Sequence, residues 1–247
     1  MKVYIGWDQR DIAADRVCKS TLLKHASIPV EIINLKEFEM RARGLYWRPF
    51  HVCSGRNPAD PEAYPNGQMV DDVDGKPFST GFSFTRFLIP ELEEFKDEWV
   101  LFMDADMMWR ADIAELQAYT EEQKAIICVK HSYAPPDTHK MDGVVQEVYN
   151  RKNWSSVMLM NPSRCRALDR DTVNTSKGSY LHGMFWLEDD QIGELPVEWN
   201  FLCGHNDPNV IDPKIVHFTR GTADMGWVDE PFADDWIQAL AEADPTL

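Results

Sequence analysis

Short apolar runs separated by polar and turn-forming residues are the main pattern along the chain. The first run, KVYIG (2–6), is rich in β-branched and aromatic residues and ends at a glycine, which predicts a buried strand and a turn. Apolar residues then recur at three- and four-residue spacing, which predicts a helix capped by Asp8 with Asp11 in its first turn. VEIINL (30–35) predicts a second strand. This strand–helix–strand order indicates a βαβ unit of a parallel sheet.

The same reasoning extends to the rest of the chain. Further strands are predicted by four apolar runs: WVLFM (99–103), AIICV (125–129), SSVMLMN (155–161) and KIVHFT (214–219). Helices are expected over 81–95, with Pro90 as a kink or break, over 112–119, and at about 232–243. The predicted fold class is therefore α/β: a single domain over residues 1–247 with a central mixed, mostly parallel sheet flanked by helices.

Residues 41–80 lack such periodicity. Five prolines interrupt this segment among glycine, asparagine and aspartate: Pro49, Pro58, Pro61, Pro65 and Pro77. The pattern predicts a long irregular insertion. Long loops beside a scaffold commonly carry specificity, so we expect this segment to shape substrate binding.

Composition and charge exclude several classes of protein. Asp and Glu outnumber Lys and Arg by 41 to 25, and the resulting net charge of −16 disfavours nucleic acid as a partner. The apolar runs are too short for a membrane span. Charged residues at 8, 10 and 11 precede any signal-peptide core, so a cytoplasmic location is expected. Five cysteines without a C-x-x-C pair are expected to be reduced packing residues.

Two acids, Asp104 and Asp106, directly follow the apolar run 99–103. Alternate residues of an extended segment share a face, and ligands of open α/β sheets gather beyond the carboxyl ends of the strands. Two carboxylates on one side suit Mg²⁺ or Mn²⁺. The alternative, a solvated turn or a helix cap, explains an isolated D-x-D triplet equally well.

Five motifs in order distinguish these alternatives: RFLIPEL, WVLFMDADMMW, NWSSVMLMNPSRC, DDQIGELPVEWNFL and IVHFTRGTADMGW. Together they resemble the nucleotide-sugar glycosyltransferases of the GT-A fold, closest to family 8 and its bacterial and phage-like relatives. The resemblance runs from Val3 to about Trp227. It implies a Rossmann-like nucleotide half, a D-x-D metal site, and transfer of a sugar from a nucleoside diphosphate sugar, most simply a UDP-sugar, to an unidentified acceptor.

The resemblance also implies roles for particular residues. Asp104, Asp106 and His217 would hold Mn²⁺ or Mg²⁺, although a histidine at a strand end is also a common structural residue. The donor-binding set would be Gly6, Asp8, Arg86, Asp104, Ala105, Asp106, Arg220 and Gly221. Helix capping explains Asp8 equally well, and a salt bridge on a helix face explains Arg86.

Around the reactive sugar carbon, the resemblance places Asp190 and Gln191 as catalytic residues, with Asn200 after them. Asp190 could instead cap the segment QIGEL. Four tryptophans in or beside motifs, one or two of which are expected near a sugar, are Trp154, Trp186, Trp199 and Trp227. Family 8 relatives retain the anomeric configuration, and attack on the same face as the leaving diphosphate is the mechanism this implies.

The last motif departs from the family pattern. Asp224 stands near the place of a lysine that meets the diphosphate in the family, so either Arg220 supplies the cation or the metal and the backbone near Gly221 hold the diphosphate. Two rival functions remain: a nucleotidyltransferase that makes sugar nucleotides, and a sugar- or partner-binding protein of the same fold that has lost catalysis.

Overall fold

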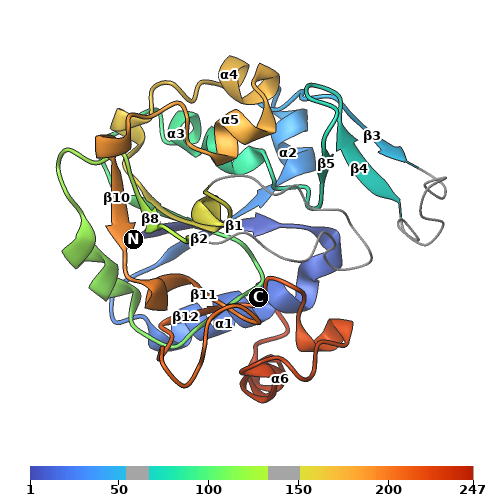
Figure 1. Ribbon diagram of the computed structural model, residues 1–247, viewed down its shortest axis with the longest axis vertical. Helices are drawn as coiled ribbons and strands as arrows, with labels where there is room; N and C mark the ends of the chain where they lie inside the picture. The colour runs from blue at the N-terminus through green and yellow to red at the C-terminus, as the bar shows by residue number, and fades with distance from the viewer. Residues whose placement is uncertain (54–66, 133–150, 247) are drawn as a thin grey trace.

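A six-stranded sheet forms the centre of the computed structural model (Figure 1), which describes residues 1–53, 67–132 and 151–246. The strand order is β10–β8–β9–β6–β1–β2. The bounds are β1 (Lys2–Trp7), β2 (Glu31–Lys36), β6 (Val100–Met103), β8 (Ile126–Val129), β9 (Val157–Met160) and β10 (Ile192–Leu195). β1 pairs in parallel with β2 and β6, and β10 with β8, whereas β9 is antiparallel to β6 and β8. The predicted mixed, mostly parallel sheet is confirmed.

Helices lie on both sides of this sheet (Figure 1). On one side are α1 (Ile12–His25), α6 (Ala233–Glu242) and a second sheet of β11 (Phe201–Leu202), β12 (Ile215–His217) and β7 (Met107–Trp109). On the other side are α2 (Glu37–Ala42), α3 (Ile89–Leu92), α4 (Arg170–Thr175) and α5 (Gly178–His182). Short 3-10 helices are Gln9–Asp11, Thr85–Leu88, Ile113–Tyr119, Trp154–Ser156, Pro162–Arg164, Asp189–Gln191, Val197–Asn200 and Ala223–Met225. The helix expected over 81–95 is thus a 3-10 turn followed by α3, with Pro90 in the first turn of α3.

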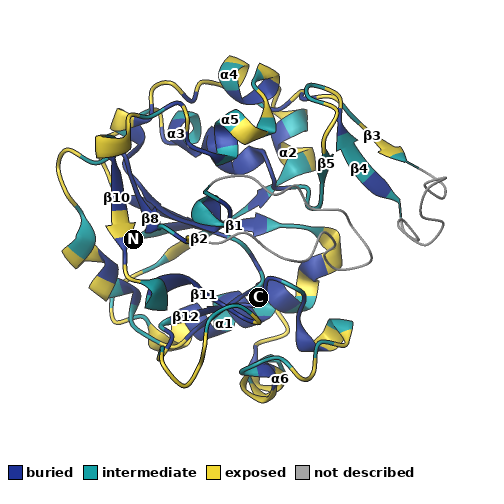
Figure 2. Ribbon diagram, viewed as in Figure 1, coloured by how far each residue is buried: buried dark blue, intermediate teal, exposed yellow. Residues whose placement is uncertain are grey.

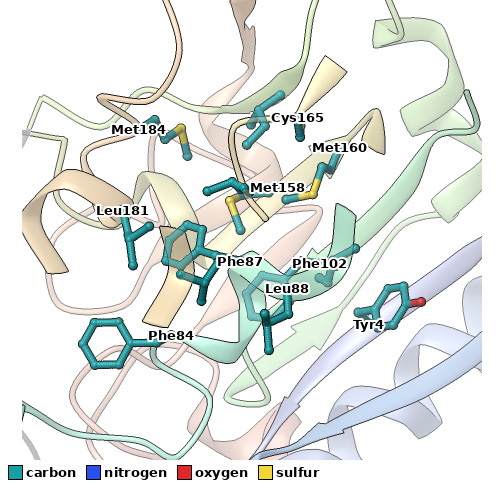
Figure 3. Close-up of a cluster of buried hydrophobic side chains, with 14 of the residues drawn as sticks. Tyr4, Phe84, Phe87, Leu88, Phe102, Met158, Met160, Cys165, Leu181 and Met184 are labelled. Atoms are coloured by element: carbon teal, nitrogen blue, oxygen red, sulfur yellow. The ribbon is translucent and has the colours of Figure 1, made fainter. Parts of the chain in front are cut away.

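Alternation along the strands divides the core into two layers, and strands β1 and β8 are mostly dark in the burial view (Figure 2). In β6, Phe102 packs into the layer under α3 and α5, whereas Leu101 and Met103 pack into the layer against α1. Figure 3 shows the first layer, where Phe87 and Met158 surround Phe102. Because both faces are covered, the strands read as continuous apolar runs, which made them recognisable in the sequence.

The segment 41–80 is not wholly irregular, and the expectation of a long irregular insertion is wrong for its described part. An antiparallel sheet of β3 (Phe50–Cys53), β4 (Gln68–Asp71) and β5 (Pro77–Phe78) occupies it. Residues 54–66, with three of the prolines, lie outside the described residues. Arg48 and Asp71, each 1% exposed, form an ion pair at 2.7 Å beside this sheet. The backbone carbonyls of Val173 and Ser176 accept further hydrogen bonds from Arg48, which fixes the small sheet to the α4 region.

The five cysteines are all unbridged, and four of them are buried, in agreement with the sequence-based expectation of reduced packing residues. Burial raises the pKa of Cys128 to about 12, so its thiol is inert at neutral pH. Within residues 1–53, 67–132 and 151–246, every helix is too short or too polar to cross a lipid bilayer.

Candidate active site

The two predicted acids lie in the turn that joins β6 to β7, at the carboxyl edge of the sheet. The N–H of Asp104 donates to the carbonyl of Ser156 at 3.0 Å, and the carbonyl of Asp106 accepts from the N–H of Phe218 at 2.9 Å. Ala105 between them is fully buried. The entry to β9 and the exit from β12 therefore hold the turn from both sides, which fixes where the two carboxylates project.

His217 joins these carboxylates. Its ligand atom and those of Asp104 and Asp106 all lie within 4.8 Å of one another. The imidazole is 2% exposed, and its Nε2 lies 3.4 Å from Oδ1 of Asp106. The prediction that the late histidine lies beside the D-x-D acids is thus met in space.

The tautomer of His217 is set from behind by Asn200. Nδ1 of His217 lies 2.9 Å from Oδ1 of Asn200, whose Nδ2 donates to Oγ of Ser156 at 2.9 Å. Because an amide oxygen only accepts, Nδ1 carries the proton and Nε2 presents its lone pair to the acids. A ligating histidine is commonly oriented in this way. Two carboxylates and a correctly tautomerised imidazole fit Mn²⁺ or Mg²⁺.

Arg86 lies behind Asp104. Its Nη1 is 2.8 Å from Oδ1 of Asp104 and donates to the carbonyl of Ser155 at 2.8 Å. The side chain is 5% exposed, and its guanidinium stacks over Phe102 at 4.7 Å. A buried cation with its charge directed at one acid offsets the repulsion between the two carboxylates. The sequence left two interpretations of Arg86, a contact with the donor and a salt bridge on a helix face. The structure shows a salt bridge, and its partner is the site residue Asp104.

A cavity of about 160 Å³ opens above the acids. Its walls come from the start of α1, the small sheet, the segment before β9, α5 and the segment after β12. Among the residues that the structure describes, the charged ones that line it are four basic and four acidic side chains: Arg10, Lys76, Arg86 and Lys152, with Asp11, Asp74, Asp104 and Asp106. This described lining is balanced in charge, in a chain whose net charge is −16.

Asp8 and Gly6 lie at the end of β1, outside the lining of this cavity. Asp8 caps the 3-10 helix Gln9–Asp11 and accepts hydrogen bonds from Arg10 and from the N–H of Gly81. Burial works to raise the pKa of Asp8, but these hydrogen bonds outweigh it and hold the pKa below its ordinary value. The capping role is the one the contacts show. A Cβ on Gly6 would lie 2.3 Å from the ring of Phe82, so glycine at this position lets Phe82 pack.

At the C-terminal side, Gly221 lines the cavity with a left-handed φ of +139°. Arg220 pairs with Glu230 at 2.9 Å, stacks over Trp227 at 5.4 Å and lies outside the lining. Asp224 is exposed and accepts from the hydroxyl of Thr222. The basic residues that reach the lining therefore come from other segments of the chain.

Asp190 and Gln191 are not brought to the acids. They directly precede β10, and Ile192 of β10 pairs in parallel with Ile126 at the start of β8, so they lie at the amino edge of the sheet. The side chain of Gln191 accepts from the N–H of Glu188 in a capping box. The cap that the contacts show is made by Glu188 and Gln191 and not by Asp190, while the catalytic role implied by the resemblance stays a prediction.

None of the four motif tryptophans is among the described residues that line this cavity. Trp199 is fully buried and packs edge-on against Trp109, and Trp186 donates its Nε1–H to a backbone carbonyl. Trp154 donates to the carbonyl of His131. These tryptophans serve packing in the described structure.

Two lining residues were not recognised from the sequence as site residues. Asp11 is 6% exposed, and burial, together with the charges of Asp106 and Asp8, raises its pKa to about 7. His182 lies at the end of α5, with Nδ1 2.9 Å from Oγ of Ser155. Neither belongs to a local pattern: Asp11 reads as a first-turn acid of a helix, and the helix that carries His182 was not predicted.

No protein-family model matches the chain. A relative by sequence is Protein CDI of Arabidopsis thaliana, 41% identical over 249 residues, which cover 98% of this chain and 86% of that protein. Solved structures of similar fold include the WbbM bifunctional glycosyltransferase (TM-score 0.60, 17% identity, 98% of this chain) and the glycosyltransferase GlyE of Streptococcus pneumoniae TIGR4 (0.54, 15%, 97%). The chain spans only 50% of WbbM and 59% of GlyE.

The galactosyltransferase LgtC, solved in complex with donor and acceptor sugar analogs, is matched over most of both chains. The TM-score is 0.53 at 14% identity, and the match covers 98% of this chain and 96% of LgtC. At these identities the likeness establishes the fold alone, and the expected GT-A-like fold is confirmed. The identity with the plant protein extends over nearly the whole sequence, and the chain therefore belongs to the family of Arabidopsis thaliana Protein CDI.

Proposed function

We propose that this protein is a glycosyltransferase that moves a sugar from a nucleoside diphosphate sugar to an acceptor, with Mn²⁺ or Mg²⁺ held by Asp104, Asp106 and His217. The observation that carries the proposal is the approach of these three side chains within 4.8 Å at the carboxyl edge of a GT-A-like sheet. A UDP-sugar is the donor we favour, and family 8 the class, because of the motif resemblance. Relatives of the same fold include LgtC, solved with donor and acceptor sugar analogs.

The residues of the site have separate tasks. A bound divalent ion would offset the negative charge that develops on the departing diphosphate. Asn200 accepts from Nδ1 of His217 and so directs Nε2 at the acids. Arg86 pairs with Asp104 and orients its carboxylate. Because the described lining is balanced in charge, one bound divalent ion would make it positive, which would attract an anionic donor in spite of the acidic surface.

We propose that transfer occurs with retention of configuration. The bond from the anomeric carbon to the diphosphate oxygen breaks, the bond to the acceptor oxygen forms on the same face, and the leaving diphosphate takes the acceptor proton. The roles of Asp190 and Gln191 beside the reactive carbon are part of the family-based proposal only, since neither lines the cavity. Residues 76–80, at the end of the small sheet, do line it and support the expectation that the segment 41–80 shapes substrate binding.

The test is donor hydrolysis, which needs no acceptor. The purified protein is incubated with UDP-, GDP- and ADP-sugars and Mn²⁺, and release of the nucleoside diphosphate is measured. Asp104→Asn and Asp106→Asn should abolish release, while Asp97→Asn, at the opposite edge of the sheet, should not. Full hydrolysis in excess chelator would contradict the metal-dependent proposal.

The two rival functions are distinguished by their substrates and products, the first of them in a second incubation. A nucleotidyltransferase forms a sugar nucleotide and pyrophosphate from a sugar phosphate and a nucleoside triphosphate, which is detected by pyrophosphate release. A protein that has lost catalysis binds the sugar nucleotide without turnover. The proximity of Asp104, Asp106 and His217 favours the transferase.

A further inference from the structure

Asp11 is placed where a carboxyl group is unfavourable in the unbound protein. Its Oδ1 is fully buried and has no hydrogen-bond partner among the described residues. It occupies the N-cap position of α1 but makes no side-chain capping bond. A buried acid without a partner costs free energy, and such groups are found where a ligand supplies the missing interaction.

Neighbouring groups in the described structure do not provide the missing hydrogen-bond partner of Asp11. The guanidinium of Arg10 bonds to Asp8 and to the carbonyl of Ser79. The metal cluster found among the described residues comprises Asp104, Asp106 and His217, so Asp11 is not a fourth ligand within its 4.8 Å limit. Asp11 nevertheless lines the same cavity as the acids. Asp11 is therefore placed to meet a polar group that enters this cavity.

We propose that Asp11 binds a hydroxyl group of the nucleotide-sugar donor. A hydroxyl both donates and accepts, so it satisfies a carboxyl in either protonation state, whereas a phosphate would be repelled by the carboxylate. The proposal rests on the proposed function, because it takes the donor to occupy this cavity. Two parts of such a donor carry hydroxyls, the ribose and the transferred sugar.

The test compares Asp11→Ala with the wild type by isothermal titration calorimetry in the presence of Mn²⁺. The probes are UDP, GDP, ADP and CDP, followed by the tightest of these as its 2′-deoxy and 3′-deoxy forms and as its glucose and galactose conjugates. If the ribose is the source, Asp11→Ala weakens the ribonucleotide about tenfold, and this loss disappears for one deoxy form. If the sugar is the source, the diphosphate binds Asp11→Ala normally and a conjugate binds about tenfold more weakly.

Asp15→Ala is the matched control. Asp15 is a buried aspartate one turn further along α1, but it is paired with Lys19 and Asn34. We expect Asp15→Ala to lower the melting temperature and leave nucleotide affinity unchanged. We expect Asp11→Ala to weaken binding of at least one probe without lowering the melting temperature. Equal affinity of wild type and Asp11→Ala for every probe overturns the inference and leaves the proposed function standing. A wild type that binds none of the probes overturns both.

Discussion

The contact between Asn200 and His217 offers the sharpest test of the proposed metal site. Asn200 is fully buried, and its amide connects the imidazole of His217 to the hydroxyl of Ser156. Asn200→Ala removes the acceptor that fixes the proton on Nδ1, so both tautomers and other ring orientations become accessible. Loss of such an outer contact commonly weakens metal binding about 10- to 100-fold, or about 1.4–2.7 kcal/mol.

The same substitution leaves Nδ1 of His217 without its partner, whereas the hydroxyl of Ser156 keeps its hydrogen bond to the carbonyl of Asn153. A buried donor without a partner costs about 1–3 kcal/mol, so the melting temperature should fall as well. Asn161→Ala is the control that separates the two effects. Asn161 is also buried and bonds to Asp97 and Ser163, but it follows β9 at the opposite edge of the sheet.

Mn²⁺ affinity is measured from the electron paramagnetic resonance signal of the free ion, at a temperature where both variants are folded. Asn161→Ala should lose stability and keep wild-type affinity, while Asn200→Ala should lose both. If Asn200→Ala binds Mn²⁺ within a factor of two of the wild type, the assigned tautomer and its role are refuted.

Three further predictions follow from the same geometry. Asp190→Asn should leave kcat of donor hydrolysis near the wild-type value, because the residue lies at the amino edge of the sheet; a large fall in kcat would restore the family-based role. Asp8→Ala should lower stability by about 1 kcal/mol in chemical denaturation through loss of its cap and should change nucleotide affinity little; a large affinity loss would instead support the donor-binding role. In metal-free protein, the folded-state pKa of Asp11 is about 7, well above its unfolded value, so Asp11 should reduce stability as pH rises from about 4 to 7, by a few kcal/mol. Asp11→Asn should remove this part of the pH dependence, and a stability difference between the two proteins that is constant with pH would contradict it.

Much of the fold was predictable because its strands are buried on both faces. Runs such as 99–103 are continuously apolar, and such runs predict strands without reference to the rest of the chain. The strands of the small sheet were missed because they are only partly buried: His51 and Val52 of β3 are exposed. β10 was missed because Glu194 interrupts a run of four residues. Local pattern therefore fails where a strand has a solvent-facing side.

The site was predictable only in part, for a related reason. Asp104 and Asp106 directly follow a recognisable strand, so their place at the sheet edge could be deduced from the sequence. His182 and Asp11 reach the same cavity from helices, and nothing local distinguishes them from other helical residues. Asp190 could not be placed from the sequence either, because its motif follows the expected order along the chain but precedes β10 at the amino edge of the sheet, and its catalytic role stays a prediction.

The reversed direction of β9 brings two described segments beside the acids. Because β8 and β9 are antiparallel, residues 130–132, which leave β8, and 151–156, which enter β9, lie at the same edge of the sheet as Asp104 and Asp106. Substitutions in these two segments should therefore alter the surroundings of the acids while the pairing of β8 with β9 stays as it is.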